Sequence, residues 1–151
     1  MQDLQDFIQL LHDQQKENNV TKLCWTNAKV LHEFAKAHLN IDIKFVCGYL
    51  VKFKNVNFGI TEHCWCEYKG VLLDPSYEYK NVPNKKYVKN FKELSLFTKN
   101  HFNKSRQREF IKKRMEFQKK FNRCNAGTMF FSLHKMNTLN YIHQHRPEWV
   151  Y

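Results

Sequence analysis

Glycine is scarce in this chain, and the sequence features of several protein classes are missing. The 151 residues include 4 Gly and contain no glycine-rich phosphate loop, internal repeat or low-complexity tract. No apolar run approaches the roughly 18 to 20 residues that span a bilayer. The amino-terminal stretch is acidic and glutamine-rich, unlike a signal peptide. We therefore expect an intracellular, cytoplasmic protein without a transmembrane segment.

A disulfide framework is also missing. The 5 cysteines are odd in number and lack the spacings of a secreted disulfide scaffold, so we expect free thiols. A hydrophobic fraction of 42% with 13 Phe, 7 Tyr and 3 Trp excludes a disordered chain. The length fits a single domain, residues 1–151, with one core.

The hydrophobic pattern predicts an α+β fold in the order helix, helix, strand, strand, strand. Helical spacing and β-branched or aromatic runs place these elements at about 3–12, 22–38, 43–53, 62–68 and 71–77.

Pro83 and Asn84 mark a boundary after the last of these strands. We expect the core of the fold over about 20–80 and a basic, mainly helical extension over about 81–151. The last 25 residues have weak periodicity, and the sequence does not place them.

The stretch HCWCEYKGVLLDPS, residues 63–76, predicts a hairpin that turns at Lys69 and Gly70. Side chains alternate between the two faces of a strand, so His63 and Asp74 fall on the same face. As diagonal neighbours they lie within reach of a hydrogen bond. An imidazole held in this way is suited to act as a general base.

The same alternation places Cys64 and Cys66 on the opposite face, where we expect them to be small buried hydrophobic residues. A structural zinc site using His63, Cys64 and Cys66 is an alternative, but these spacings match no standard finger.

Cys24 is the thiol with the better setting for catalysis. It falls in the first turn of the second predicted helix, where backbone N–H groups and the helix dipole stabilise a thiolate. A cysteine at a helix end facing a histidine on a strand makes a nucleophile and its base, with Asp74 as the group that orients the base. The competing interpretation is that Cys24 is an ordinary core residue.

The two segments CWTNAKVLHEFAKAHLNIDIKFVCGYL and EHCWCEYKGVLLDPSYE resemble the core of the transglutaminase-like superfamily, a branch of the papain-like cysteine enzymes. In that family a cysteine opens a helix, a histidine follows in a H-A/C-W-x-E motif, and an aspartate follows in L-D-P-T/S. The resemblance implies that Cys24 is the nucleophile, His63 the base and Asp74 the orienting carboxylate. It covers about residues 20–78 and implies a nucleophile helix packed on an antiparallel sheet.

Other site residues are expected around this triad. The Cys24 backbone N–H is one oxyanion donor, and Asn18 or Asn19 is a candidate for the second. Trp25, Trp65 and Tyr77 are candidate cleft walls, with core packing as the alternative. The sequence contains no acidic cluster that would suggest a calcium site. We expect no metal and no cofactor.

A strongly basic helix is predicted over about 104–121. Residues 104–123 hold nine Lys or Arg against two Glu, within a net charge of +11. The helix either docks by its Phe stripe with a solvated basic face, or binds nucleic acid, an anionic lipid surface or an acidic protein. The candidate polyanion-binding residues are Lys112, Lys113, Arg114, Lys119 and Lys120.

The sequence therefore predicts a cysteine-dependent enzyme that attacks an amide or peptide bond through a thioester. We expect a peptidase, amidase or deamidase in preference to amine transfer or cross-linking, acting on a peptide or protein. The alternative is a non-catalytic protein of the same fold that binds nucleic acid or another polyanion through its basic helix.

Overall fold

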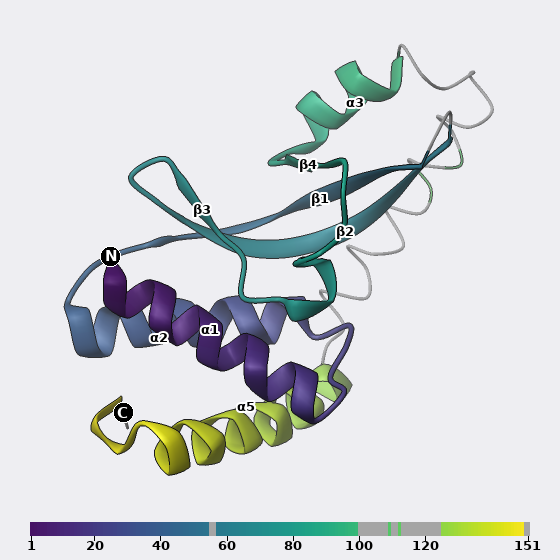
Figure 1. The fold of residues 1–151 in the computed structure, drawn as a ribbon. Coiled ribbons are helices and arrows are strands. Elements are labelled where there is room, and N and C mark those ends of the chain that lie inside the picture. The colour runs from purple at the N-terminus through teal and green to yellow at the C-terminus, as the bar shows by residue number, and fades with distance from the viewer. Residues whose placement is uncertain (55–56, 100–108, 110–111, 113–124, 150–151) are drawn as a thin grey trace.

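The computed structural model describes residues 1–54, 57–99, 109, 112 and 125–149. It shows an α+β arrangement in which helices α1 and α2 lie against a curled antiparallel sheet (Figure 1). The elements are α1 (Gln2–Glu17), α2 (Cys24–Leu39), β1 (Lys44–Lys54), β2 (Asn57–Tyr68), β3 (Val71–Leu73), η1 (Tyr77–Tyr79), β4 (Lys85–Val88), α3 (Phe91–Lys99), α5 (Asn125–His145) and η2 (Pro147–Trp149). The predicted order of the first five elements is confirmed.

Helix α1 is longer than its apolar pattern predicted. Leu4, Phe7 and Leu11 are buried at helical spacing, as expected. The helix continues to Glu17 because its last turns bury polar side chains in place of apolar ones. Gln15, for example, is buried and donates from Nε2 to the Pro75 carbonyl at 2.6 Å.

Helix α2 begins at Cys24, as the position of this residue in the sequence suggested. Its carboxyl end is set by Asn40, which adopts a left-handed conformation with φ of 51° and donates its N–H to the Ala35 carbonyl. The buried face of α2 includes Ala28, Leu31 and Phe34. Phe34 stacks on Phe7 of α1 with ring centroids 3.7 Å apart, which joins the two helices.

The predicted hairpin is present, but its second strand is short. Lys69 and Gly70 form the turn with φ values of 50° and 76°, as a two-residue turn of this kind requires. Tyr68 pairs with Val71, and the ladder ends where Cys66 pairs with Leu73.

The prediction that the second strand extends to Tyr77 is wrong. Pro75 has no N–H for a ladder, and the Ser76 N–H bonds to Asp74 Oδ1 at 2.9 Å instead. The chain therefore leaves the sheet at Asp74, and the strand edge of β2 beyond Cys66 is not covered by β3.

The sheet continues past Pro83, because β4 pairs antiparallel with β1 and gives the order β3-β2-β1-β4. Gly48 of β1 permits close packing here. A Cβ atom at this position would lie 2.3 Å from the Val88 carbonyl oxygen and 2.7 Å from Trp65 Cη2. Only glycine fits at that point of the strand.

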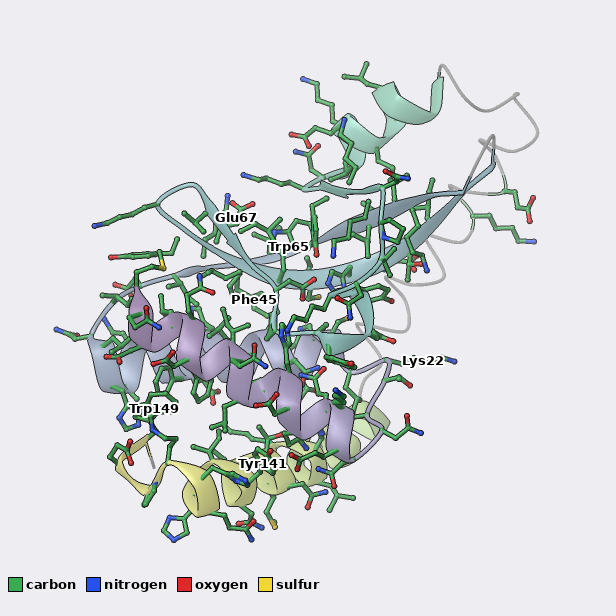
Figure 2. The ribbon with its side chains drawn as sticks, viewed as in Figure 1. Lys22, Phe45, Trp65, Glu67, Tyr141 and Trp149 are labelled. Atoms are coloured by element: carbon green, nitrogen blue, oxygen red, sulfur yellow. The ribbon has the colours of Figure 1, made fainter. Side chains whose placement is uncertain are left out.

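The main core lies between the sheet and helices α1, α2 and α5, and it includes Cys64, Cys66 and Leu73 from the sheet. Trp149 closes its far end, with its ring 5.7 Å from Phe7 (Figure 2). A smaller cluster joins β1 and β4 to α3 through Leu94.

Helix α5 covers α1 and α2 on the side away from the sheet (Figure 1). It buries His134, Thr138 and Ile142, which are spaced four residues apart. Two of these three are polar, which explains why the sequence showed weak periodicity here. Across the described residues, no helix combines the length and apolar character needed to cross a membrane.

Candidate active site

Cys24 is the first residue of α2, and its side chain is half-buried against the main core. The residue before it, Leu23, provides no side-chain cap for the helix. The first turn therefore directs backbone N–H groups that have no intrahelical partner toward the space in front of Cys24. These groups and the helix dipole favour a negative charge on the sulfur.

His63 lies on β2 and is held by Asp74, as the hairpin alternation predicted. Its Nε2 is 2.8 Å from Asp74 Oδ2. The His63 side chain is 0% exposed and that of Asp74 is 10% exposed, so the pair is largely removed from water. His63 Nδ1 is buried and has no hydrogen-bond partner of ordinary geometry among the described residues. This is the ring nitrogen left for an incoming proton.

Asp74 is itself fixed by three donors. Besides His63, its Oδ2 accepts the hydroxyl of Tyr87 at 2.6 Å, and its Oδ1 accepts the Ser76 N–H at 2.9 Å. Tyr87 lies on the edge strand β4, so the far side of the sheet helps to orient the carboxylate. Tyr87 was not among the predicted site residues, because the short strand that carries it was not predicted.

Helix α1 holds the backbone of Asp74 and of the residues that follow it. Gln15 Oε1 accepts the Tyr77 N–H at 2.9 Å while its Nε2 donates to Pro75. His12 Nε2 is 3.0 Å from the Asp74 carbonyl oxygen. Burial lowers the pKa of His12, so this ring is neutral near pH 7 and its Nε2–H donates. The loop that carries Asp74 is thus tied to α1 at three points.

Cys24 interacts with His63, which lies on β2 beyond the end of its pairing with β3. The same thiol also interacts with the thiol and the backbone of Cys64. The prediction that Cys64 and Cys66 are buried is confirmed, with exposures of 2% and 0%. The sequence did not indicate that Cys64 also neighbours Cys24, although it lies on the strand next to His63.

The charges of Cys24 and His63 affect each other. The neighbouring Cys64 thiol has the largest effect on the pKa of Cys24, burial opposes it, and the nearby imidazole of His63 and its charge assist it. Together they lower the pKa of Cys24 to about 5. Burial acts to lower the pKa of His63, but the hydrogen bond to Asp74 and the neighbouring Cys24 outweigh it and raise this pKa to about 9. Between these two values Cys24 is a thiolate and His63 an imidazolium.

The aromatic side chains expected as cleft walls are spread over three places. Trp65 is fully buried and stacks beside His63 with centroids 6.0 Å apart, whereas Trp25 packs edge-on against Phe45 at 6.1 Å. Figure 2 shows Trp65 within the sheet layer. Tyr77 packs against His12 of α1, with ring centroids 6.2 Å apart.

Tyr79 is a ring neighbour of His63 that the sequence did not suggest. Its centroid lies 4.7 Å from that of His63, edge to face, and its side chain is half-exposed. Tyr79 is the last residue of the short helix η1, which begins after Pro75 and Ser76. A helix of this length has no hydrophobic period that would show which way the Tyr79 side chain points.

The candidate oxyanion donors lie in two different parts of the structure. The Cys24 backbone N–H lies at the start of α2. Asn18 and Asn19 are exposed in the loop after α1, and the Asn18 amide donates to the Gln14 carbonyl at 2.9 Å, where it ends that helix.

The basic helix predicted over 104–121 lies outside the described residues except for Glu109 and Lys112, and Lys112 is exposed. Lys113, Arg114, Lys119 and Lys120 are all outside them. Within the described part of the chain, no group of three or more His, Cys, Asp or Glu side chains is arranged to hold a metal ion.

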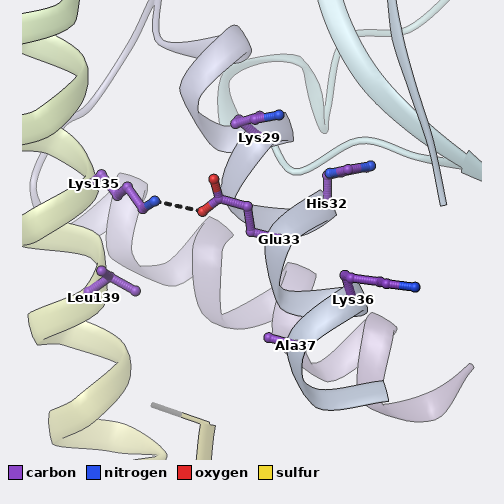
Figure 3. A pocket seen from close by; sticks show the side chains of 7 residues that line it. All are labelled: Lys29, His32, Glu33, Lys36, Ala37, Lys135 and Leu139. Atoms are coloured by element: carbon purple, nitrogen blue, oxygen red, sulfur yellow. Dashed lines mark ion pairs between the residues drawn. The ribbon is translucent and has the colours of Figure 1, made fainter. Parts of the chain in front are cut away.

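A pocket of about 450 Å³ lies between α2 and α5 (Figure 3). Its lining includes the basic side chains of Lys29, Lys36 and Lys135 together with apolar ones. Lys135 of α5 pairs with Glu33 of α2 across it at 2.7 Å. None of the residues that line it belongs to the Cys24 cluster.

No family model, curated protein or solved structure matches this chain. The interpretation of the site therefore depends on its own geometry and on the motifs in the sequence.

Proposed function

We propose that this chain is a thiol enzyme with a transglutaminase-like, papain-like core that attacks an amide or peptide bond through Cys24. One observation carries the proposal. The thiol at the start of α2 and the imidazole of His63 interact, and the second ring nitrogen of that imidazole is bound to a buried, three-fold hydrogen-bonded carboxylate. Cys24 is thus placed as the nucleophile, His63 as its base and Asp74 as the group that orients the base.

In the first step, the Cys24 thiolate attacks the acyl carbon of the substrate. The developing negative charge on the carbonyl oxygen is stabilised by the Cys24 backbone N–H at the helix start. The His63 imidazolium then transfers its proton to the leaving amine, the carbon–nitrogen bond breaks, and a thioester remains on Cys24.

In the second step, neutral His63 takes a proton from the incoming nucleophile, which displaces Cys24 as a thiolate. Asp74 keeps the imidazole in the tautomer that offers Nδ1 for each transfer, and Tyr87 fixes Asp74 in turn. We propose water as the usual nucleophile, which makes the protein a peptidase, amidase or deamidase. An amine as the nucleophile would give acyl transfer.

Trapping the thioester tests this function without knowledge of the natural substrate. The full chain is mixed with a p-nitrophenyl ester at pH 7, and trypsin then releases Cys24 in the peptide 23–29. We expect a burst of about one p-nitrophenolate per chain and the acyl mass on that peptide. Cys24→Ala should abolish the burst, and Cys66→Ala, which alters a buried thiol bonded to the Ala28 carbonyl, should retain it. Acylation confined to lysines or to Cys47 would overturn the proposal.

A further inference from the structure

Three of the four described cysteines form one cluster that spans α2 and two strands. Cys47 of β1 lies directly opposite Cys64 of β2 in the sheet, and their sulfur atoms are 3.0 Å apart. The Cys24 thiol also interacts with Cys64, which is therefore the common neighbour of the other two thiols. All are free thiols, and Cys47 is exposed whereas Cys64 is buried. The fourth, Cys66, instead donates to the Ala28 carbonyl at 3.3 Å.

We propose that Cys24, Cys64 and Cys47 form a thiol relay that accepts oxidation by a hydroperoxide and returns Cys24 to its thiolate form. The proposal rests on the proposed function in one respect, because it requires Cys24 to be the reactive thiolate. It adds a modification site and a regulation of the enzyme that the acyl-transfer chemistry does not need.

The relay begins when the Cys24 thiolate attacks a peroxide oxygen. The O–O bond breaks, Cys24 becomes a sulfenic acid, and the other oxygen leaves as hydroxide or alkoxide and takes a proton from solvent. The Cys64 sulfur then attacks the Cys24 sulfur. The S–O bond breaks, the Cys64 proton leaves with the hydroxyl group as water, and a Cys24–Cys64 disulfide forms.

The second transfer moves the disulfide to the sheet. The Cys47 thiolate attacks the Cys64 sulfur, the bond to Cys24 breaks, and Cys24 leaves as a thiolate. Cys47 is exposed, so its proton passes to solvent as the attacking thiolate forms. The 3.0 Å separation must shorten by about 1 Å to reach a disulfide bond length.

The direction of this exchange follows from the surroundings of each sulfur. A thiol with a low pKa is the better leaving group, and Cys24 is stabilised as a thiolate by the helix start and by His63. The product disulfide has one exposed partner, Cys47, on which a dithiol reductant can attack. Two electrons from that dithiol restore both thiols and leave the reductant as a disulfide.

Peptide mapping of the full chain after treatment with one equivalent of hydrogen peroxide tests the relay. Trypsin separates the three sulfurs into peptides 23–29, 45–52 and 55–69. Fragmentation of the last peptide distinguishes Cys64 from Cys66. In the wild type we expect a Cys47–Cys64 linkage with Cys24 still open to alkylation. In Cys47→Ser we expect the linkage to stop at Cys24–Cys64.

Cys24→Ala and Cys66→Ala complete the test. Cys24→Ala should slow formation of the Cys47–Cys64 linkage at least tenfold, and Cys66→Ala should leave it unchanged. Cys24 sulfenic acid without any linkage to Cys64 would overturn the relay, as would an unchanged rate in Cys24→Ala. If Cys24 is alkylated rapidly in a His63-dependent way but no linkage forms, the relay fails while the proposed function stands. If Cys24 behaves as an ordinary thiol, both fail.

Discussion

Replacing Asp74 with asparagine should weaken the fold as well as the site. Asp74 and His63 form a pair whose side chains are 10% and 0% exposed. The carboxylate accepts three hydrogen bonds, two on Oδ2 and one on Oδ1. Asparagine has nearly the same shape and leaves no cavity, but it offers a single acceptor oxygen. Its NH2 group must therefore face either the His63 and Tyr87 donors or the Ser76 N–H.

The expected size of the effect follows from that mismatch. Removing one partner of a buried ion pair costs about 3–5 kcal/mol. Because asparagine keeps one oxygen acceptor, we expect the lower end, about 3 kcal/mol of unfolding free energy at pH 7. The pKa of His63 should also fall, since burial would no longer be offset by the carboxylate.

Urea unfolding followed by tryptophan fluorescence measures the first effect, and the NMR titration of the His63 ring measures the second. The matched control is Asp42→Asn, which breaks an ion pair with Lys36. The side chain of Asp42 is 83% exposed and that of Lys36 is 56% exposed. Such a surface pair contributes less than about 1 kcal/mol. If Asp74→Asn costs no more than Asp42→Asn and the His63 pKa does not move, the account of Asp74 as a buried anchor is wrong.

Three further substitutions probe the surroundings of the site. Gly48→Ala should destabilise the protein by about 1–3 kcal/mol or more in urea unfolding, because its methyl group would overlap the Val88 carbonyl; a loss below about 0.5 kcal/mol would contradict the packing of β4. Tyr87→Phe removes one hydrogen bond to the Asp74 carboxylate and should cost about 1.5–3 kcal/mol; an unchanged midpoint would show that this bond contributes nothing. Gln15→Ala leaves two backbone groups of the Asp74 loop without partners and should cost about 2–5 kcal/mol, and local protection from hydrogen exchange in that loop should fall; unchanged protection would contradict its role as a clamp.

The contact between His63 and Asp74 was predictable from sequence because it depends on local rules. A two-residue turn at Lys69 and Gly70 sets the register, and alternation sets the faces. Both residues lie within the same hairpin, so no long-range packing was needed to bring them together.

The remaining parts of the site were not predictable, because they come from distant segments. Gln15 and His12 act from α1, and Tyr87 acts from an edge strand of four residues. The side chains from α1 are polar and buried, so they carry no hydrophobic pattern that shows where they point. The same holds for His134 and Thr138. Because these buried residues are polar, the sequence of α5 shows no clear hydrophobic period.

The place of Cys64 shows the limit of the alternation rule. Its side chain does face the core, as predicted, but the rule did not show that this side chain also meets Cys24 of α2. The end of β3 depends on Pro75 and on the Ser76 N–H bond to Asp74, which decided how far the hairpin extends.

The pH dependence of Cys24 alkylation, in the intact protein and in His63→Ala, tests the central claim most directly. Iodoacetamide is used at low concentration, and labelling of Cys24 is followed on the tryptic peptide 23–29. In the intact protein we expect the rate to fall as pH is lowered through about 5, the value to which the Cys24 pKa is lowered. In His63→Ala the midpoint should move up toward the value of about 8.5 of a free thiol. A midpoint near 8.5 in both proteins, or the same low midpoint in both, would contradict a Cys24–His63 catalytic pair.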